Sequence, residues 1–361
     1  RGCSACGCST GGGSGSCLSI SLRVAGWGAA LTTGGGIALR RKFSASQFWS
    51  DVRHHGASSF IYIGELLRYL MNQPPSPQDR DHTIRVIAGN GLRPDIWEKF
   101  AERFGIHQIR EFYGATEGNA ANVNLENRVG MVGRLLPGQR IVKCDLATGE
   151  VRRNEAGFCE DVEVGETGLL ITVISSATPF DGYADKEATE KKILVDVFKK
   201  GDRCFNTGDL LCAHENKWMA FVDRVGDTFR WKGENVSTNE VAETLNEAPG
   251  VLESNVYGVP IPGADGRAGM ASLNCSEEFD LKVFTQFVCE KLPIFQRPYF
   301  LRLQQEMRIT GTFKHQKVDY QKEGYDPSRV GDPLYFLDGD TYRPLDEATF
   351  EAISKGQLAL R

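Results

Sequence analysis

Two strand-like runs joined by one amphipathic helix constrain the fold of this chain more than any other feature. Residues 83–88 form the first run and residues 109–112 the second. Between them, Pro94 opens a helical pattern with an apolar face, and Gly105 closes it. Because parallel neighbours need such a crossover, the pattern predicts a β-α-β unit in an α/β fold.

A glycine-rich segment follows each of these two runs. Residues 89–91 read Gly-Asn-Gly, and residues 113–118 read Tyr-Gly-Ala-Thr-Glu-Gly. In a parallel pair both segments lie at the carboxyl edge of the sheet, where α/β proteins bind ligands. There, Thr116 can donate its hydroxyl to a phosphate or carboxylate oxygen, and Glu117 offers the hard oxygen ligand that Mg²⁺ prefers. The sequence therefore predicts a ligand site at this edge.

A further aspartate follows a glycine turn in the run Asn-Thr-Gly-Asp at residues 206–209. A carboxylate there can accept two hydrogen bonds from the 2′ and 3′ hydroxyls of a ribose. Such a motif is common by chance, and by itself it predicts only a turn. Asp209 becomes a candidate ribose ligand because of the run that comes after it.

That run, residues 223–238, mixes aromatic and charged side chains between two glycines. Phe229 and Trp231 alternate with charged residues, and Gly226 and Gly233 bracket them. An ordinary surface hairpin has little need for this combination. The run resembles the hinge and first β-ribbon of the small C-terminal domain of adenylate-forming enzymes. Within them it is most similar to the very long-chain acyl-CoA synthetases, also called fatty acid transport proteins.

The resemblance starts near Leu22 and extends over most of the chain. It is carried by residues 24–31, 37–45, 61–70, 113–118, 206–211 and 309–317. It implies the C-terminal part of a large adenylate-forming domain, with parallel sheets, helices and a β-rich subdomain, followed by a small α+β lid domain. We expect the partial large domain at residues 22–222 and the small domain at residues 223–361.

The first residues do not share the resemblance. Residues 1–21 are biased toward glycine, serine and cysteine, and we expect a low-complexity segment that does not pack. Four cysteines in this segment have a spacing that could ligate zinc: Cys3, Cys6, Cys8 and Cys17. No histidine lies near them, so we favour the low-complexity interpretation.

The resemblance implies a set of cofactor-binding residues. They are Gly89, Asn90, Gly91, Tyr113, Thr116, Asp209, Arg224 and Gly233. Tyr113 would stack on adenine beside the 89–91 loop, Thr116 would meet the phosphates, and Glu117 would hold Mg²⁺. Asp209 would bind the ribose, with Arg224 as its neighbour on the ribose or phosphate.

The resemblance also implies a lysine that bridges the acyl carboxylate and the α-phosphate. Lys314 takes this role, and Lys317 is a weaker candidate. The catalytic residues implied are thus Lys314, Thr116 and Glu117. The reaction implied uses ATP, Mg²⁺ and coenzyme A: a fatty acid carboxylate attacks the α-phosphorus, and the coenzyme A thiol then attacks the acyl-adenylate. Between the steps the small domain would turn about the hinge and present the Gly233 loop.

One element of the family is missing. A phosphate-binding loop rich in Ser, Thr and Gly and closed by a lysine should lie upstream, whereas no lysine occurs before Lys42. The chain thus resembles roughly the second half of such an enzyme, which argues against catalysis by this polypeptide alone. A non-catalytic lipid-handling protein of the same fold stays open as an alternative, as does a CoA ligase for a bulky acid such as a bile acid.

Composition limits the partners and the location. The 361 residues carry a net charge of −5, which gives no electrostatic case for nucleic-acid binding. The sequence has no apolar run of the roughly 20 residues that cross a membrane, and no signal peptide is evident. We therefore expect small-molecule substrates and a place on the cytoplasmic side, where any membrane contact would be peripheral. The acyl-chain length and a coupling to fatty acid uptake are left open.

Overall fold

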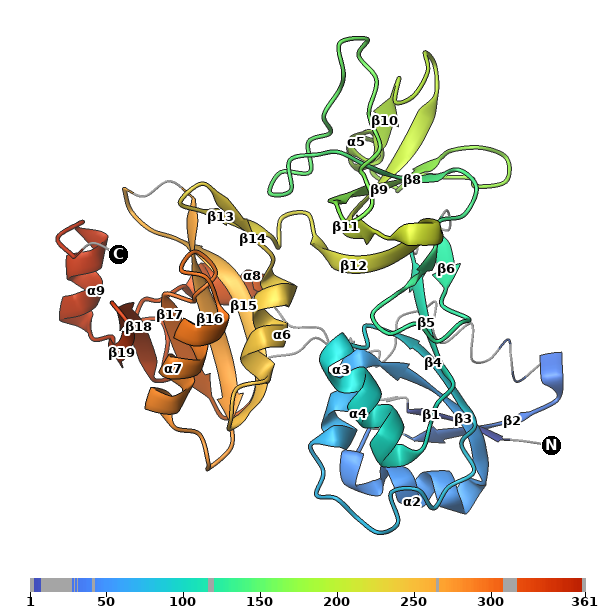
Figure 1. Ribbon diagram of the computed structural model, residues 1–361, viewed down its shortest axis with the longest axis horizontal. Coiled ribbons are helices and arrows are strands. Elements are labelled where there is room, and N and C mark those ends of the chain that lie inside the picture. Colours follow the sequence, from blue (N-terminus) through green and yellow to red (C-terminus); the bar gives the residue numbers. More distant parts are fainter. Residues whose placement is uncertain are drawn as a thin grey trace. The chain divides into compact units, whose positions relative to one another are not determined.

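The computed structural model describes residues 3–7, 28, 30, 32–40, 43–115, 120–263, 266–307 and 317–358. They divide into two compact units (Figure 1). The first unit consists mainly of the chain up to Phe221, and the second mainly of the chain from Val222 onward, with Asp145–Glu150 grouped with the second. The division lies next to the domain boundary expected between residues 222 and 223.

The first unit contains a mostly parallel sheet in the order β2-β1-β3-β4-β5-β6. Its strands are β1 (Cys3–Gly7), β2 (Gly36–Arg40), β3 (Ala57–Ile63), β4 (Val86–Asn90), β5 (Ile109–Gly114) and β6 (Ala121–Val123). The first five strands pair in parallel, and β6 pairs with β5 antiparallel. The α/β fold expected from the sequence is confirmed.

Strand β1 differs from the expectation that residues 1–21 do not pack. Its residues pair in parallel with β2 on one side and with β3 on the other. A strand of small residues can join a ladder because the ladder is built from backbone N–H and C=O groups. The side chains of the four cysteines considered for zinc lie outside the described part of the chain.

Three helices cover one face of this sheet: α2 (Ala45–His55), α3 (Gly64–Met71) and α4 (Pro94–Phe104). Trp97, Phe100 and Phe104 form the buried side of α4 and join strand residues such as Ile87 in one core. The helix begins at Pro94 and ends before a left-handed Gly105, as predicted.

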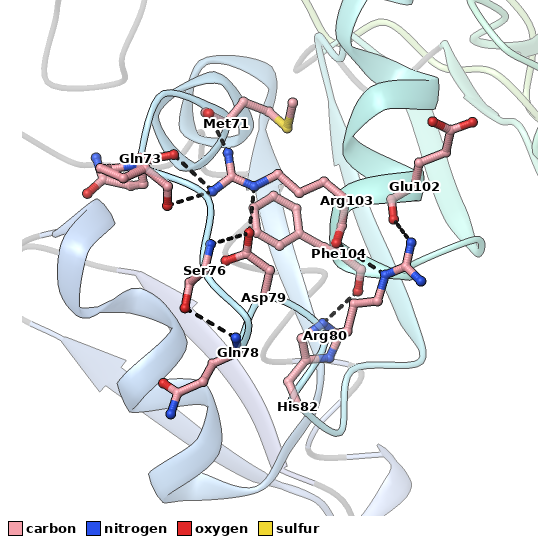
Figure 2. Close-up of polar contacts among 11 residues, drawn as sticks. Met71, Gln73, Ser76, Gln78, Asp79, Arg80, His82, Glu102, Arg103 and Phe104 are labelled. Carbon is pink, nitrogen blue, oxygen red and sulfur yellow. Dashed lines mark hydrogen bonds and ion pairs between the residues drawn. The ribbon is translucent and has the colours of Figure 1, made fainter.

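Two arginines donate hydrogen bonds to the carbonyl groups at the ends of α3 and α4 (Figure 2). Arg103 of α4 reaches the end of α3, and Arg80, in the loop between the helices, reaches the end of α4. The guanidinium of Arg103, on α4, donates to the carbonyls of Met71 (2.6 Å) and Gln73 (2.9 Å), and its Nε donates to Asp79 (2.8 Å). In return, Arg80 donates to the carbonyls of Glu102 and Arg103. These bonds replace the backbone partners that the last turn of each helix lacks.

The first unit also contains a second, antiparallel sheet in the order β7-β12-β11-β9-β8, with β10 beside β11. Its strands are β7 (Gly133–Arg134), β8 (Gln139–Val142), β9 (Thr167–Val173), β10 (Ile193–Val195), β11 (Arg203–Ala213) and β12 (Trp218–Arg224). The short helix α5 (Lys186–Lys191) precedes β10, and the 3₁₀ turn η1 (Glu215–Lys217) precedes β12. This is the β-rich subdomain that the sequence predicts.

The second unit is an α+β unit. A ribbon of β13 (Phe229–Trp231) and β14 (Glu234–Val236) precedes a sheet of β15 (Val251–Pro260), β16 (Arg267–Cys275), β17 (Phe300–Gln304), β18 (Leu334–Asp338) and β19 (Thr341–Pro344). Its helices are α6 (Thr238–Asn246), α7 (Leu281–Lys291), α8 (Lys317–Glu323) and α9 (Glu347–Ser354). Ser254 bonds to the Ala242 carbonyl on α6, whereas Tyr257 stacks on Tyr320 of α8. Because residues an odd number apart on a strand face opposite sides, α6 and α8 cover opposite faces.

Candidate nucleotide-binding site

The 89–91 segment and the described part of the second segment, residues 113–115, lie at the carboxyl ends of the neighbouring parallel strands β4 and β5. Strand β4 pairs with β3 through Tyr62 and Gly89, and with β5 through Gly89 and Glu111. Gly89 and Asn90 are thus the last residues of β4 itself, and the strand expected at residues 83–88 lies a few residues further along. Both segments come to one edge, as the β-α-β pattern predicts.

The 89–91 segment is packed so closely that Gly89 has no room for a side chain. A β-carbon at Gly89 would lie 2.2 Å from the carbonyl oxygen of Tyr62. Gly64, at the start of α3, lies against Gly91, and a β-carbon at Gly64 would lie 1.6 Å from the Gly91 carbonyl oxygen. Gly91 itself has a φ of +79°, which favours glycine. The segment is therefore a fixed part of the sheet edge.

A buried carboxyl group holds the end of this segment. Glu111, on β5, is 3% exposed. Its Oε1 accepts hydrogen bonds from the backbone N–H groups of Gly91 and of Leu92 (3.2 Å), and its Oε2 accepts one from the hydroxyl of Tyr62. Burial raises the pKa of Glu111 to about 8, and these hydrogen bonds oppose part of that rise.

Tyr113 and Asp209 lie in direct contact, although they come from different sheets of the first unit. The Tyr113 hydroxyl donates to Oδ2 of Asp209 over 2.6 Å, and both residues are 8% exposed. Asp209 lies at an irregularity within β11, where Gly208 has a φ of +76°. The Thr207 hydroxyl fixes the irregularity, because it donates to the Leu170 carbonyl (2.7 Å) and accepts from the Asp209 N–H (3.1 Å). The turn expected at residues 206–209 is therefore a bulge inside a strand.

Asn90 contributes a buried acceptor at the same edge. Its Oδ1 atom is shielded from solvent and accepts no hydrogen bond from the residues that the structure describes. A buried amide oxygen without a donor costs free energy unless a ligand or water supplies one. The atom therefore fits a ligand with an N–H or O–H donor, such as the amino group of adenine.

Three predicted site residues cannot be placed. Thr116, Glu117 and Lys314 lie outside the described residues. Among the residues that are described, no three His, Cys, Asp or Glu side chains gather as metal ligands would. Mg²⁺ at Glu117 therefore stays a prediction, and no step below depends on its geometry.

Two predicted residues, Arg224 and Gly233, lie in the second unit. Arg224 ends β12, and its backbone N–H donates to the side chain of Asp223 (2.9 Å). Gly233 turns the β13–β14 ribbon with a φ of +87°, and Lys232 before it has a φ of +50°. Two consecutive left-handed residues form the tight hairpin turn that suits twisted strands. The Gly233 loop is thus a rigid turn.

Lys317, the weaker candidate for the catalytic lysine, has partners within the second unit. Its ammonium donates to the Thr238 hydroxyl (2.6 Å) and pairs with Asp227 (3.4 Å). Oδ2 of Asp223 accepts from both the N–H and the hydroxyl of Thr238, each over 2.8 Å. Lys317 and Asp223 therefore tie the segment after β12 to the start of α6. This gives Lys317 a structural role, and the choice of Lys314 as the bridging lysine stays a prediction.

The comparisons with known proteins agree with this architecture. Residues 18–172 match the model of a family described as AMP-binding enzyme. Long-chain fatty acid transport protein 2 of Rattus norvegicus is 50% identical over 341 residues, which cover 91% of this chain and 55% of that protein. Long-chain fatty acid transport protein 1 of Homo sapiens is 45% identical over 349 residues, covering 93% of this chain and 54% of that protein. The chain is thus similar to fatty acid transport proteins over about nine tenths of its length.

The chain spans about half the length of the curated relatives it matches. Among solved structures, ATP-bound MatB from Rhodopseudomonas palustris has a TM-score of 0.69 at 22% identity, covering 88% of this chain and 60% of that one. MenE from Bacillus subtilis in complex with AMP has a TM-score of 0.62 at 19% identity, covering 88% and 60%. At such identities the similarity establishes the fold, which is that of adenylate-forming enzymes.

Two residues of the site were not predicted from the sequence. Glu111 and Tyr62 were not singled out, although they hold the 89–91 segment. One signal for Glu111 is visible: it is an acidic residue that alternates along its short strand with Ile109 and Tyr113, and so shares a face of the sheet with them. A carboxyl group in such a strand needs partners once it is buried. No comparable signal marks Tyr62.

The described helices were compared with the length and hydropathy that a membrane-spanning helix needs. None of them is long and apolar enough to cross a bilayer.

Proposed function

We propose that the protein serves in the ATP-dependent ligation of a long or very long-chain fatty acid to coenzyme A, through an acyl-adenylate. The observation that carries this proposal is the hydrogen bond between Tyr113 and Asp209. It joins two residues from separate motifs and separate sheets, one expected to bind adenine and the other to bind ribose. Similarity to AMP-binding enzymes and to fatty acid transport proteins supports the same conclusion.

The nucleotide would be held by residues from four strands, β4, β5, β11 and β12. Tyr113 would lie against the adenine ring, and Asn90 Oδ1 would accept a proton of the adenine amino group. Asp209 would accept hydrogen bonds from the ribose hydroxyls, and the Tyr113 hydroxyl keeps its carboxylate oriented. Arg224 would contact the ribose or phosphate from the domain junction. A carboxylate held by a neighbouring hydroxyl is preorganised, which lowers the cost of binding.

In the first step a carboxylate oxygen of the fatty acid attacks the α-phosphorus, and the bond to pyrophosphate breaks. Lys314 would offset the negative charge that builds up on the α-phosphate and the carboxylate, and Thr116 would bond to phosphate oxygens. Mg²⁺ at Glu117 would supply further charge neutralisation when bound.

In the second step the coenzyme A thiolate attacks the acyl carbonyl carbon, and AMP leaves with the electrons of the acyl–oxygen bond. The residues near Arg224 would act as a hinge that withdraws Lys314 and brings the Gly233 turn to the site. Gly226, with a φ of +90°, suits a hinge because glycine tolerates large changes in φ and ψ. The rigid β13–β14 turn would keep its shape during this movement.

The proposal includes the location and partners of the protein. Its partners are the fatty acid, ATP and coenzyme A. We place it on the cytoplasmic side, in peripheral contact with a membrane that supplies the fatty acid. Ligation there would trap a fatty acid that has crossed the bilayer, since a charged thioester crosses back poorly.

Calorimetric titration of this chain with AMP and with a non-hydrolysable acyl-adenylate analogue tests the proposal. Asp209→Ala should weaken binding by about 10- to 100-fold, the loss expected for hydrogen bonds to a charged group. Asp161→Ala is the control, because Asp161 pairs with Arg140 in an exposed position of the same sheet. A folded chain that binds neither ligand, or an Asp209→Ala variant that binds as well as the control, would overturn the proposal.

A further inference from the structure

Glu111 is a buried carboxyl group that the proposed nucleotide contacts do not use. With Tyr62 and Gly89 it forms one row across β3, β4 and β5, since Tyr62 pairs with Gly89 and Gly89 pairs with Glu111. The two outer side chains meet above the middle strand, where the Tyr62 hydroxyl donates to Oε2 of Glu111. We call these three residues, Tyr62, Gly89 and Glu111, the clasp, because the outer two are joined by a hydrogen bond over β4.

The clasp depends on the absence of a side chain at its centre. A β-carbon at Gly89 would lie 2.5 Å from the nearest ring carbon of Tyr62, so any other residue would push the ring aside. Glycine in a strand interior weakens the strand and often marks close approach of other groups. At Gly89 the approaching group is the tyrosine that reaches Glu111.

The other oxygen of Glu111 determines where the chain goes after β4. It accepts from the N–H groups of Gly91 and Leu92, the two residues that follow Asn90. Asn90 is therefore fixed in two ways. Asn90 itself pairs with Ile63 of β3, and Glu111 holds the two residues that follow Asn90. Its buried Oδ1 atom is left without a donor among the described residues.

We propose that Glu111 is a positioning residue for nucleotide binding, which through Gly91 and Leu92 fixes Asn90 as the acceptor that reads the adenine amino group. The inference rests on the proposed function. Glu111 does not contact the nucleotide in this role, because both of its oxygens already accept hydrogen bonds from protein groups. A displaced Asn90 would weaken AMP binding and lessen the preference for AMP over IMP, which has a carbonyl in place of the amino group.

The test compares three variants of this chain: Glu111→Gln, Glu111→Ala and Tyr62→Phe. Glutamine can accept from Gly91 and Leu92 through Oε1 and donate to the Tyr62 oxygen through its amide nitrogen. Alanine loses all of these contacts, and phenylalanine loses only the hydroxyl. Each variant is assayed for hydrogen exchange at the Gly91 and Leu92 amides and for the dissociation constants of AMP and IMP.

We expect Glu111→Ala to speed exchange at both amides at least about tenfold, to weaken AMP binding about tenfold, and to leave IMP binding changed by less than about threefold. Glu111→Gln should restore all three values to within about threefold of the wild type, and Tyr62→Phe should fall between. Val52→Ala is the control, because Val52 lies in the same core on α2, away from the clasp.

Several results would overturn the proposal. One is unchanged exchange at Gly91 and Leu92 in Glu111→Ala; another is a Val52→Ala variant, matched in melting temperature, that loses AMP preference equally. Equal weakening of AMP and IMP in Glu111→Ala would also contradict it. A wild-type chain that binds no AMP but shows the expected exchange pattern would overturn the proposed function and leave Glu111 as a positioning residue of the loop.

Discussion

The backbone of Gly64, at the first residue of α3, lies directly against the carbonyl group of Gly91, just after β4. Gly64 follows β3 and Gly91 follows β4, so they lie just beyond the ends of two neighbouring strands. Each residue allows the other to approach closely. Gly64 gives room by lacking a β-carbon, and Gly91 turns its carbonyl inward through a left-handed φ of +79°. The position of the 89–91 segment therefore depends on Gly64, a residue outside that segment.

Gly64→Ala should displace this segment, because the added β-carbon would lie 1.6 Å from the Gly91 carbonyl oxygen. We expect a loss of about 1 to 3 kcal/mol in the free energy of unfolding, the usual cost of overpacking. AMP affinity should fall with it. Urea unfolding and calorimetry measure the two effects. Gly331→Ala is the matched control, since nothing lies within 4 Å of a β-carbon there. Equal stability of the two variants would contradict the argument.

The stability of the first unit should depend on the ionisation of Glu111. Its pKa is raised by burial from 4.5 to about 8 in the folded chain, whereas the unfolded chain keeps the ordinary value. Between these two pH values the folded state binds more protons than the unfolded state. The contribution of Glu111 to stability is therefore present at low pH and is lost as the pH rises toward 8.

Glu111→Gln should remove this dependence, because glutamine does not titrate. Relative to the wild type, the variant should gain stability as the pH rises from about 5 to about 8, by at most about 1.4 kcal/mol per pH unit. Urea unfolding at half-unit pH steps measures the difference. Parallel curves for the two proteins would show that Glu111 does not titrate in this range.

Arg103→Met should destabilise the first unit by about 2 kcal/mol, because it removes charge-assisted hydrogen bonds that are largely shielded from water. The Arg103 side chain is 15% exposed and bonds to Asp79 and to three carbonyl groups. Arg140→Met provides the contrast. Arg140 also pairs with an aspartate, but both side chains are more than 40% exposed, and we expect a loss below about 1 kcal/mol. Thermal unfolding of the two variants side by side measures the difference, and equal losses would refute it.

Asp223→Ala should destabilise the second unit by about 2 to 3 kcal/mol, since it leaves donors at the start of α6 without their buried acceptor. Asp223 is 1% exposed and accepts from the Thr238 N–H and hydroxyl. Asp280→Ala removes the N-cap of α7, which bonds to the N–H groups of Lys282 and Val283 at the surface. That loss should be about 1 kcal/mol. Urea unfolding measures both, and a reversed order would contradict the burial argument.

Local signals in the sequence predict some elements closely. Pro94 and Gly105 mark the two ends of α4 because proline suits the first turn of a helix and glycine the left-handed residue after the last. Ser237 caps α6, accepting from the N–H of Glu240, and a serine three residues before a glutamate is a local signal for the start of a helix. In these cases the residues that decide the structure lie within a few positions of the element they define.

Other features depend on partners far away in the sequence. Gly-Asn-Gly at residues 89–91 reads locally as a loop, yet Gly89 and Asn90 are in β4, because the pairing with Tyr62 and Ile63 decides where the strand ends. Asp209 could be chosen only by resemblance, since its contact with Tyr113 spans 96 positions. The role of Glu111 could not be predicted for the same reason, because its hydrogen-bond partner Tyr62 lies 49 positions earlier.

The side chains that close the ends of α3 and α4 have a consequence for how the first unit opens. Arg103 can bond to the carbonyls after α3 only while α4 is wound to its end, and Arg80 can cover the last carbonyls of α4 only while the loop between the helices is in place. Fraying of either helix therefore removes the cap of the other. The two helix ends and the intervening loop form one cooperative segment, which unfolds and refolds as a whole at the edge of the sheet opposite the candidate nucleotide site.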